Sequence, residues 1–387
     1  MPEERDAFRF TTKVGEQGRI TIPVRVLQAA KLGVDDYATF EVLPSVDLSL
    51  EGEQATSHEF EVKQRLAEAK EIGDNTFNAY LPMWMKNFRA NLDLIPKDAF
   101  SLKAVKDVEK GRKAIVVGGG PSLKEKTDWD SLRTFDGAIL ATNKALAPLL
   151  KEGVVPTMVL TLDGLPEVMK SFEDPIVEQY RKKIDYLGPT VTDPAVTKFV
   201  LSWAKKCVWG NPHMPSSEES SAWNLNLILE LFNGLELLRH GGNVGTMGWL
   251  VAKHLGCNPI ALIGFDMCFH PDPSWTREQA IGYEYYYSPL NNEMMALDSA
   301  FKAYLSILSD VTDMGWQEGV ATVNMTPVGA LNSSRLYPNI TLTDYISKDA
   351  PRIIEESKKE RDEGIALMMK LIQDIRDAAK PIFRQDL

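Results

Sequence analysis

Short apolar runs alternate with longer, helix-forming segments through the middle of the chain. The run Ala114–Val117 is entirely apolar and three of its four residues are β-branched, which predicts a buried strand. Similar runs recur between residues 111 and 345, with helical segments between them. Strands that alternate with helices are typical of a parallel sheet covered on both faces. We therefore predict an α/β fold with a Rossmann-like, mostly parallel sheet and flanking helices.

Polar residues follow five of these apolar runs directly. In an open parallel sheet, ligands bind beyond the carboxyl ends of the strands. A single Asp in such a place most often forms a turn or caps a helix, but five polar ends on one rim favour a binding site. The five pairs are 138–142 before Asn143, 158–162 before Asp163, 186–192 before Asp193, 260–265 before Asp266, and 321–323 before Asn324.

A glycine turn follows the first of the strands. Gly118, Gly119 and Gly120 would let the backbone turn tightly beside a ligand, and Ser122 is expected to cap the next helix. A helix N-terminus favours an anion, so the segment predicts either a phosphate site or a tight structural turn. It lacks the Gly-Lys-Ser/Thr ending of a Walker loop and the spacing of a G-x-G-x-x-G motif.

A second glycine turn lies at Gly241, Gly242 and Asn243, ahead of a helix expected over residues 247–255. Its amides would meet a second anionic group, or its glycines would only permit close helix packing. Asp163 and Asp266 are the best candidates for a magnesium site, because Mg²⁺ takes one or two carboxylates together with substrate phosphates. No His/Cys spacing typical of zinc is present.

The pattern divides the chain into four parts. Residues 1–46 alternate as short strands around one helix, and residues 47–110 combine a polar linker with helices at 60–72 and 75–94. Residues 111–345 form the α/β unit, and residues 346–387 end the chain with an amphipathic, charge-rich helix at 352–378.

The first part resembles the AbrB-type swapped-hairpin family through residues 13–23 and 32–37. The resemblance implies an intertwined β homodimer through residues 8–45 and, in many members, DNA binding. Residues 1–45 hold six basic and seven acidic side chains, whereas a DNA-binding face normally shows a basic excess. We therefore favour dimerisation over DNA recognition.

Composition limits which kinds of partner the protein is expected to bind and in which compartment it is expected to work. The 387 residues are 44% hydrophobic and 25% charged, as in ordinary globular proteins, and the net charge of −11 argues against broad nucleic-acid binding. No apolar run approaches the ~20 residues of a membrane helix, and the polar first residues are not typical of a signal peptide. Three cysteines without CxxC spacing favour a reducing, cytoplasmic setting.

Five segments, in this order along the chain, resemble the MptE-like family, which is named for 6-hydroxymethylpterin diphosphokinases. The related motility-associated (Maf) glycosyltransferases, which resemble sialyltransferases, share the signature. The segments are residues 115–123, 162–163, 241–244, 255–267 and 324–331.

The resemblance implies a transferase and leaves two chemistries open. A diphosphokinase would bind ATP and Mg²⁺ and pass a pyrophosphoryl group to a pterin-like hydroxymethyl acceptor, with Asp163 and Asp266 as metal ligands. A glycosyltransferase would bind a CMP or UDP sugar, with His270 as the catalytic base. The nucleotide-binding candidates are Gly118, Gly119, Gly120, Ser122, Asn143, Asp193, Gly241, Gly242 and Asn243.

A third possibility comes from another class of protein. An AbrB-type DNA-binding regulator would use the large unit only to sense a nucleotide.

Overall fold

The computed structural model describes residues 79–214, 222–270, 283–288, 293–332 and 337–383. The AbrB-like unit and the expected helix at 60–72 lie outside these residues. Among the described helices, none is long and apolar enough to span a bilayer.

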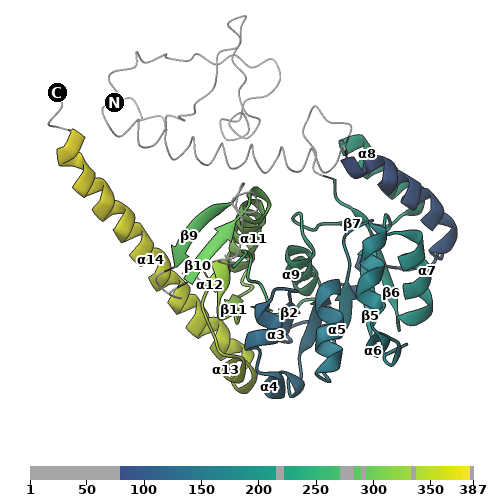
Figure 1. Cartoon of the computed structure of the whole chain (residues 1–387), viewed down its shortest axis with the longest axis horizontal. Coiled ribbons are helices and arrows are strands. Elements are labelled where there is room, and N and C mark those ends of the chain that lie inside the picture. The colour runs from purple at the N-terminus through teal and green to yellow at the C-terminus, as the bar shows by residue number, and fades with distance from the viewer. Residues whose placement is uncertain (1–78, 215–221, 271–282, 289–292, 333–336, 384–387) are drawn as a thin grey trace, which may run out of the picture. The chain divides into compact units, whose positions relative to one another are not determined.

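Nine of the described strands form one parallel sheet in the order β1-β6-β5-β4-β3-β2-β8-β11, with β7 beside β6 (Figure 1). β9 and β10 form a separate antiparallel hairpin. The strands are β1 (Phe100–Ser101), β2 (Ala114–Val117), β3 (Ala138–Thr142), β4 (Met158–Leu160), β5 (Asp185–Pro189), β6 (Cys207–Pro212), β7 (Leu237–Leu238), β8 (Ile260–Ile263), β9 (Glu284–Ser288), β10 (Glu293–Leu297) and β11 (Thr322–Asn324).

Helices cover both faces of the sheet, which confirms the predicted α/β class. The helix at 79–94 comes first. The others are η1 (Leu102–Val105), α3 (Ser122–Lys126), α4 (Trp129–Arg133), α5 (Asn143–Lys151), η2 (Pro166–Phe172), α6 (Pro175–Glu178), α7 (Pro194–Trp203), α8 (Ala222–Asn233), α9 (Val244–His254), α11 (Ser299–Gln317), α12 (Gly329–Asn332), α13 (Leu342–Ser347) and α14 (Ala350–Phe383).

The core has two layers because successive side chains of a strand point to opposite faces. Ile115 of β2 packs in a cluster with Leu149 of α5. Its neighbour Val116 packs in a second cluster with Met247 and Trp249 of α9. All of these side chains are fully buried, so β2 is an interior strand, as its continuous apolar run predicts.

Several element boundaries differ from the expected ones. β4, β5 and β8 end at Leu160, Pro189 and Ile263, two or three residues earlier than expected. Apolar residues that follow β5 and β8, such as Val191 and Phe265, are buried although they lie in loops. Helix α9 begins three residues earlier than expected because Asn243 caps it. The helix expected at 352–378 is present within α14.

Tyr345 of α13 anchors this part of the chain to the first residues of the sheet. Its ring is fully buried, and its hydroxyl oxygen lies 2.8 Å from the carbonyl oxygens of both Ala114 and Pro259. Tyr345→Phe removes the donor from a fully buried site, so we expect it to lower the free energy of unfolding by about 1–2 kcal/mol. Chemical denaturation measures this loss. Tyr180 is only partly buried, so Tyr180→Phe serves as the control and should change the free energy of unfolding little. Equal losses in the two variants would contradict the anchoring role of the Tyr345 hydroxyl.

Candidate functional site

The carboxyl ends of four neighbouring strands form one rim. Val117 of β2 lies opposite Ala141 of β3 and Ile263 of β8, and Thr142 of β3 lies opposite Leu160 of β4. The strands thus end at nearly the same level. The residues that follow them share one edge of the sheet, as the polar strand ends predict.

The glycine turn after β2 is packed against two other backbone segments. The Gly118 amide donates to the Ile263 carbonyl at 2.8 Å, and a Cβ at Gly118 would lie 2.4 Å from the Gly264 carbonyl oxygen. A Cβ at Gly119 would lie 2.7 Å from Cβ of Lys144 at the start of α5. Close backbone packing therefore requires glycine here, whatever the turn binds.

Asp266, which follows β8, holds the same turn by hydrogen bonds. It is 2% exposed, and its carboxylate accepts hydrogen bonds from the Ser122 amide at 3.1 Å and from the Ser122 hydroxyl. A Cβ at Gly120 would lie 2.3 Å from its Oδ1. His270 Nε2 lies 3.3 Å from its Oδ2, with about a third of the His270 side chain exposed.

The expected capping role of Ser122 is wrong. Pro121 occupies the N-cap of α3 without a side-chain hydrogen bond, and Ser122 is the first residue of the helix. The Ser122 hydroxyl points to Asp266 instead. Because α3 has only five residues, its dipole is too short to make a strong anion site.

Asp163 differs from Asp266 in its surroundings. It follows β4 and lines a hollow of about 550 Å³. Burial raises the pKa of Asp163, and the positive charge of Lys144 partly offsets this. Asp163 is exposed, and no described residue hydrogen-bonds its carboxylate.

The hollow lies between α5, η2 and the end of α3, and its walls are rich in lysine. Lys151 forms an ion pair with Asp174 at 2.5 Å. With the described residues, the other three lysines form no ion pair. The lysines that line the hollow are Lys124, Lys144, Lys151 and Lys170.

The N-terminus of α5 opens at the same hollow. Asn143, its first residue, lines the hollow and donates from Nδ2 to the Ser171 hydroxyl at 2.9 Å. Thr142 occupies the N-cap, but its side chain does not cap the helix. Its buried hydroxyl has no partner among the described residues. The first-turn amides of a helix have no intrahelical acceptor, so this end of α5 suits an anion.

The second glycine turn is shaped by backbone conformation and capping. Gly241 and Gly242 have φ values of +59° and +80°, which favour glycine. Asn243 caps α9, accepting from the Thr246 amide at 2.8 Å and donating to its hydroxyl at 2.8 Å. His240 accepts from the Gly242 amide at 3.0 Å, and burial lowers the His240 pKa to about 4. A neutral imidazole therefore holds the turn.

Tyr304 of α11 is a rim residue that no local sequence pattern indicates. A Cβ at Gly242 would lie 3.3 Å from Cε1 of Tyr304, so the ring lies against the second glycine turn. Burial raises the Tyr304 pKa, and the charges of Asp163 and Asp298 raise it further. The raised pKa favours a neutral phenol, which lies against the turn and within electrostatic range of Asp163.

Asp193 and the two metal candidates have different environments. Asp193 is the N-cap of α7 and accepts from the Ala195 amide at 2.8 Å. Asp163 and Asp266 follow β4 and β8, which β2 and β3 separate, a distance of about 14 Å across the sheet. The described residues contain no group of three or more His, Cys, Asp or Glu side chains placed to hold a metal ion.

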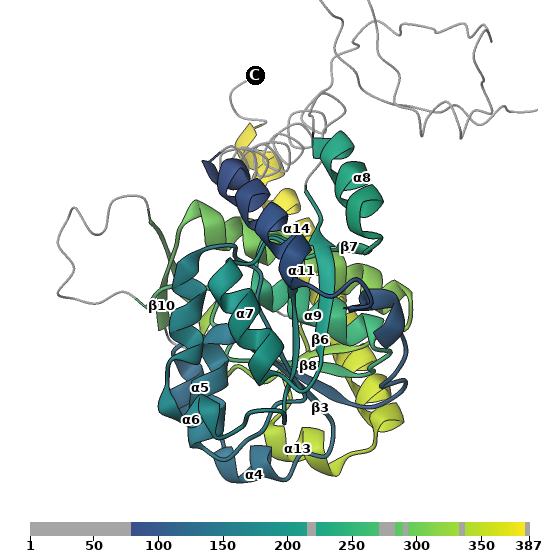
Figure 2. The same ribbon diagram turned by 90° about the vertical axis from the view of Figure 1, so that its right-hand side faces the viewer.

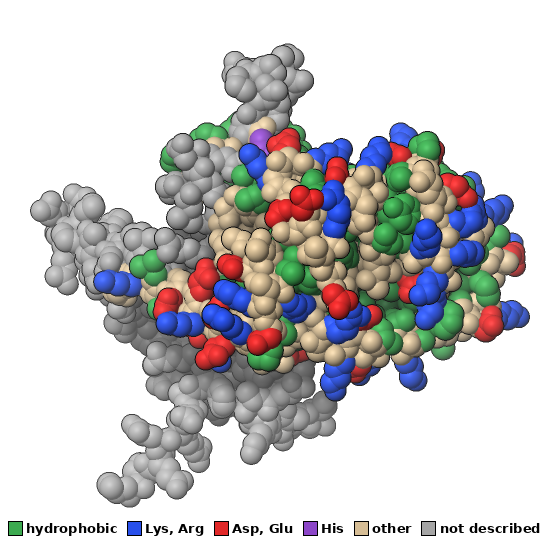
Figure 3. Space-filling view, turned by 90° about the horizontal axis from the view of Figure 1, so that it is seen from below, with side chains coloured by type: hydrophobic (Ala, Val, Ile, Leu, Met, Phe, Trp, Pro, Cys, Tyr) green, Lys and Arg blue, Asp and Glu red, His purple; other side chains and the backbone are tan. Residues whose placement is uncertain are grey.

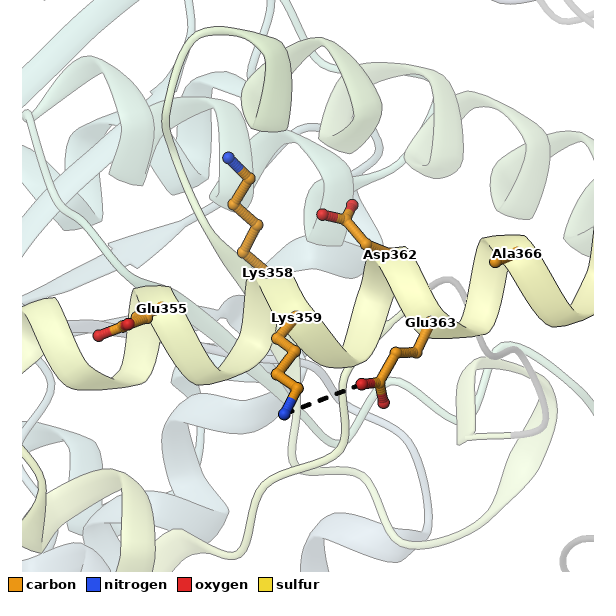
Figure 4. Close-up of a pocket in the computed structure, with 6 residues that line it drawn as sticks. All are labelled: Glu355, Lys358, Lys359, Asp362, Glu363 and Ala366. Carbon is orange, nitrogen blue, oxygen red and sulfur yellow. Dashed lines mark ion pairs between the residues drawn. The ribbon is translucent and has the colours of Figure 1, made fainter.

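A second hollow, of about 450 Å³, lies on α14 (Figure 4). All its lining residues come from this one helix, and Lys359 pairs with Glu363 across one turn at 3.9 Å. Lys358 and Asp362 point to the other side of the helix. This is a solvated, charge-rich helix surface and not a binding site. Basic and acidic side chains are also interspersed over the face seen in Figure 3.

Comparison with known proteins shows what this part of the chain is similar to. Residues 86–272 match the MptE-like family. The matching model is described as 6-hydroxymethylpterin diphosphokinase MptE-like. The match covers the first glycine turn, Asn143, Asp163, the second glycine turn and Asp266, and it confirms the resemblance over this segment.

A solved structure agrees at the level of the fold. The MAf glycosyltransferase from Magnetospirillum magneticum AMB-1 superposes with a TM-score of 0.53 and 14% sequence identity. The alignment covers 73% of this chain, and the chain spans about two fifths (42%) of that protein. No curated protein sequence matches the chain.

Gly118→Ala tests the packing of the first glycine turn. The added Cβ meets a backbone carbonyl that cannot move alone, so we expect a loss of about 2 kcal/mol or more in the free energy of unfolding. Gly234→Ala is the control, because its φ is +69° but nothing lies within 4 Å of an added Cβ. Backbone strain alone should cost it about 1 kcal/mol. Equal losses in urea unfolding would contradict the packing account.

Asp163→Asn tests the environment of this carboxylate. A raised pKa means that the ionised form destabilises the folded state, and the cost disappears as pH falls through the folded-state pKa. We expect Asp163→Asn to raise Tm at pH 7 and to leave it nearly unchanged once wild-type Asp163 is protonated. Differential scanning calorimetry across pH measures this. A lower Tm for the variant at pH 7 would contradict it.

Proposed function

We propose that the chain is a Mg²⁺-dependent, diphosphokinase-type transferase that binds ATP at the carboxyl rim of its sheet. The observation that carries the proposal is the lysine-lined hollow at the N-terminus of α5, which Asp163 and Asn143 also line. The family match over this rim supports a transferase, since a diphosphokinase and a glycosyltransferase both transfer a group from a donor to an acceptor.

The hollow suits the phosphate chain of the nucleotide. The chain as a whole carries a net charge of −11, which repels a polyanion. Lys124, Lys144 and Lys170 provide local positive charge without a described ion-pair partner to compete for it. The positive end of α5 adds to their effect, because anions are stabilised at helix N-termini. Asn143 would donate to a phosphate or to the base.

Magnesium fits this site through one protein carboxylate. Mg²⁺ commonly takes one or two carboxylates, substrate phosphates and waters, and Asp163 faces the hollow without a described hydrogen bond. Asp266 fits less well, because Ser122 already occupies both of its oxygens. When bound, the ion would neutralise charge on the phosphates. Lys144 would hold the ionised form of Asp163 beside it.

The acceptor would lie on the side of the rim formed by Gly242 and Tyr304. Among the described residues, no aromatic side chain lines the lysine-rich hollow, whereas a planar pterin-like acceptor stacks best on an aromatic ring. The ring of Tyr304 offers such a surface against the second glycine turn. In this proposal the nucleotide and the acceptor would bind on opposite sides of Asp163.

The second candidate is a glycosyltransferase that uses a CMP or UDP sugar. It is favoured by the contact between His270 and Asp266, in which a buried carboxylate orients a partly exposed imidazole. A His–Asp pair of this kind is suited to remove a proton from an acceptor hydroxyl. The glycosyl transfer would need His270 as the base. The diphosphokinase reaction would instead depend chiefly on Asp163 and on the lysines that line the hollow.

Isothermal titration calorimetry with ATP, CMP and UDP, each with and without Mg²⁺, separates the candidates. We expect ATP to bind most tightly and only weakly without Mg²⁺. Lys144→Ala should weaken ATP binding by about tenfold, or about 1.4 kcal/mol. Lys358→Ala on α14 is the matched control and should leave binding unchanged. Binding by CMP or UDP alone would exclude the diphosphokinase, and equal effects of both lysine variants would exclude this hollow.

A further inference from the structure

Two asparagines on the helix at 79–94 face the α/β unit. Asn87 and Asn91 are four residues apart, so they lie on the same face of the helix. Their side chains are 4% and 0% exposed. Asn is depleted in protein interiors unless its polar atoms are bonded. The pair therefore marks specific hydrogen bonds and not general packing.

Each asparagine joins the helix to loops at the rim. Asn87 Nδ2 donates to the Gly164 carbonyl at 2.8 Å and to the Val191 carbonyl at 3.0 Å. Asn91 Nδ2 donates to the Thr190 carbonyl at 2.8 Å and to the Thr192 carbonyl at 2.7 Å. Asn87 thus holds the loop after β4, and both asparagines hold the loop after β5.

Packing holds the helix in the position that these bonds need. Phe88 is buried in a cluster with Val191 and Leu229 of α8, and Trp84 packs at its edge. Figures 1 and 2 show α8 beside this helix. A Cβ at Gly164 would lie 2.8 Å from Cδ1 of Trp84, so only glycine fits between the helix and the β4 loop.

We propose that Asn87 is a positioning residue that sets the direction of Asp163 by fixing the backbone of Gly164, the next residue. The Asp163 carboxylate has no described hydrogen bond, so its direction depends on the backbone that carries it. One hydrogen bond from Asn87 Nδ2 holds the Gly164 carbonyl, and a second, to the Val191 carbonyl, fixes the direction of the amide. Neither Ala nor Leu can donate these bonds. The inference rests on the proposed function only in placing Asp163 beside the bound nucleotide.

Asn91 provides a control within the same helix. It is at least as buried as Asn87 and also donates two hydrogen bonds to carbonyls, but its partners Thr190 and Thr192 follow β5. Loss of either side chain leaves two buried carbonyls without a donor, so both losses should cost similar stability. Only the loss of Asn87 releases the residue next to Asp163.

Carboxyl labelling tests the proposal without any ligand. Carbodiimide-driven coupling of glycine ethyl ester, followed by peptide mass spectrometry, measures the accessibility of each carboxylate. We expect Asn87→Leu to raise labelling of Asp163 by about twofold while Asp174, in the same hollow, keeps its wild-type rate. Asn91→Leu should leave Asp163 unchanged. Asn87→Ala also loses both donors but adds no bulk or charge, and it should match Asn87→Leu if the latter folds poorly.

Two results would overturn the proposal. One is wild-type labelling of Asp163 in both Asn87 variants. The other is an equal rise in Asn91→Leu, which would show a general loosening of the helix.

An ATP titration then separates this inference from the proposed function. Asn87→Leu should weaken ATP binding in Mg²⁺ about as much as Asp163→Asn does. In the Asp163→Asn background it should add nothing, because its effect passes through Asp163. Additive effects would contradict the positioning role. If the wild-type chain binds no ATP, the proposed function fails, while the labelling experiment still decides the role of Asn87.

Discussion

The contact between two backbone segments, at Gly118 and Gly264, is the constraint on which the rim depends. It brings the turn after β2 so close to the loop after β8 that neither residue can carry a Cβ without displacing a carbonyl. Gly264 has a φ of +70°, which turns the β8 loop back across the β2 turn. Asp266 closes the contact through Ser122. The start of α5 packs against the same turn, because a Cβ at Gly119 would lie 2.7 Å from Cβ of Lys144. These contacts therefore fix the position of Lys144, which lines the hollow.

Charge is distributed unevenly around this rigid contact. The acidic groups serve different purposes: Asp266 holds the backbone, Asp193 caps α7, and only Asp163 of these three faces the hollow. Lysines from α3, α5 and η2 gather opposite it. An acidic protein can in this way offer a local site for a polyanion, while the charge of Lys144 partly offsets the raised pKa of Asp163.

The sequence predicted the parallel sheet and its polar rim because both depend on local patterns. Asn143 and Asp163 meet at one hollow as their strand ends indicate. Ser122 was assigned to a cap because its partner Asp266 lies 144 positions away. The roles of Tyr304 and Asn87 also arise from contacts between distant segments, which no periodicity records. The AbrB-like dimer, which we favour over DNA binding, and the cytoplasmic setting stay predictions.

A crystal structure with ADP and Mg²⁺ tests the central claim most directly. The account predicts that the phosphates lie in the hollow between α5 and η2, within hydrogen-bond distance of Lys144 and the first turn of α5. It also predicts Asp163, and not Asp266, beside the metal ion. Phosphates bound away from α5, or a metal ion on Asp266 with the bonds to Ser122 broken, would contradict it.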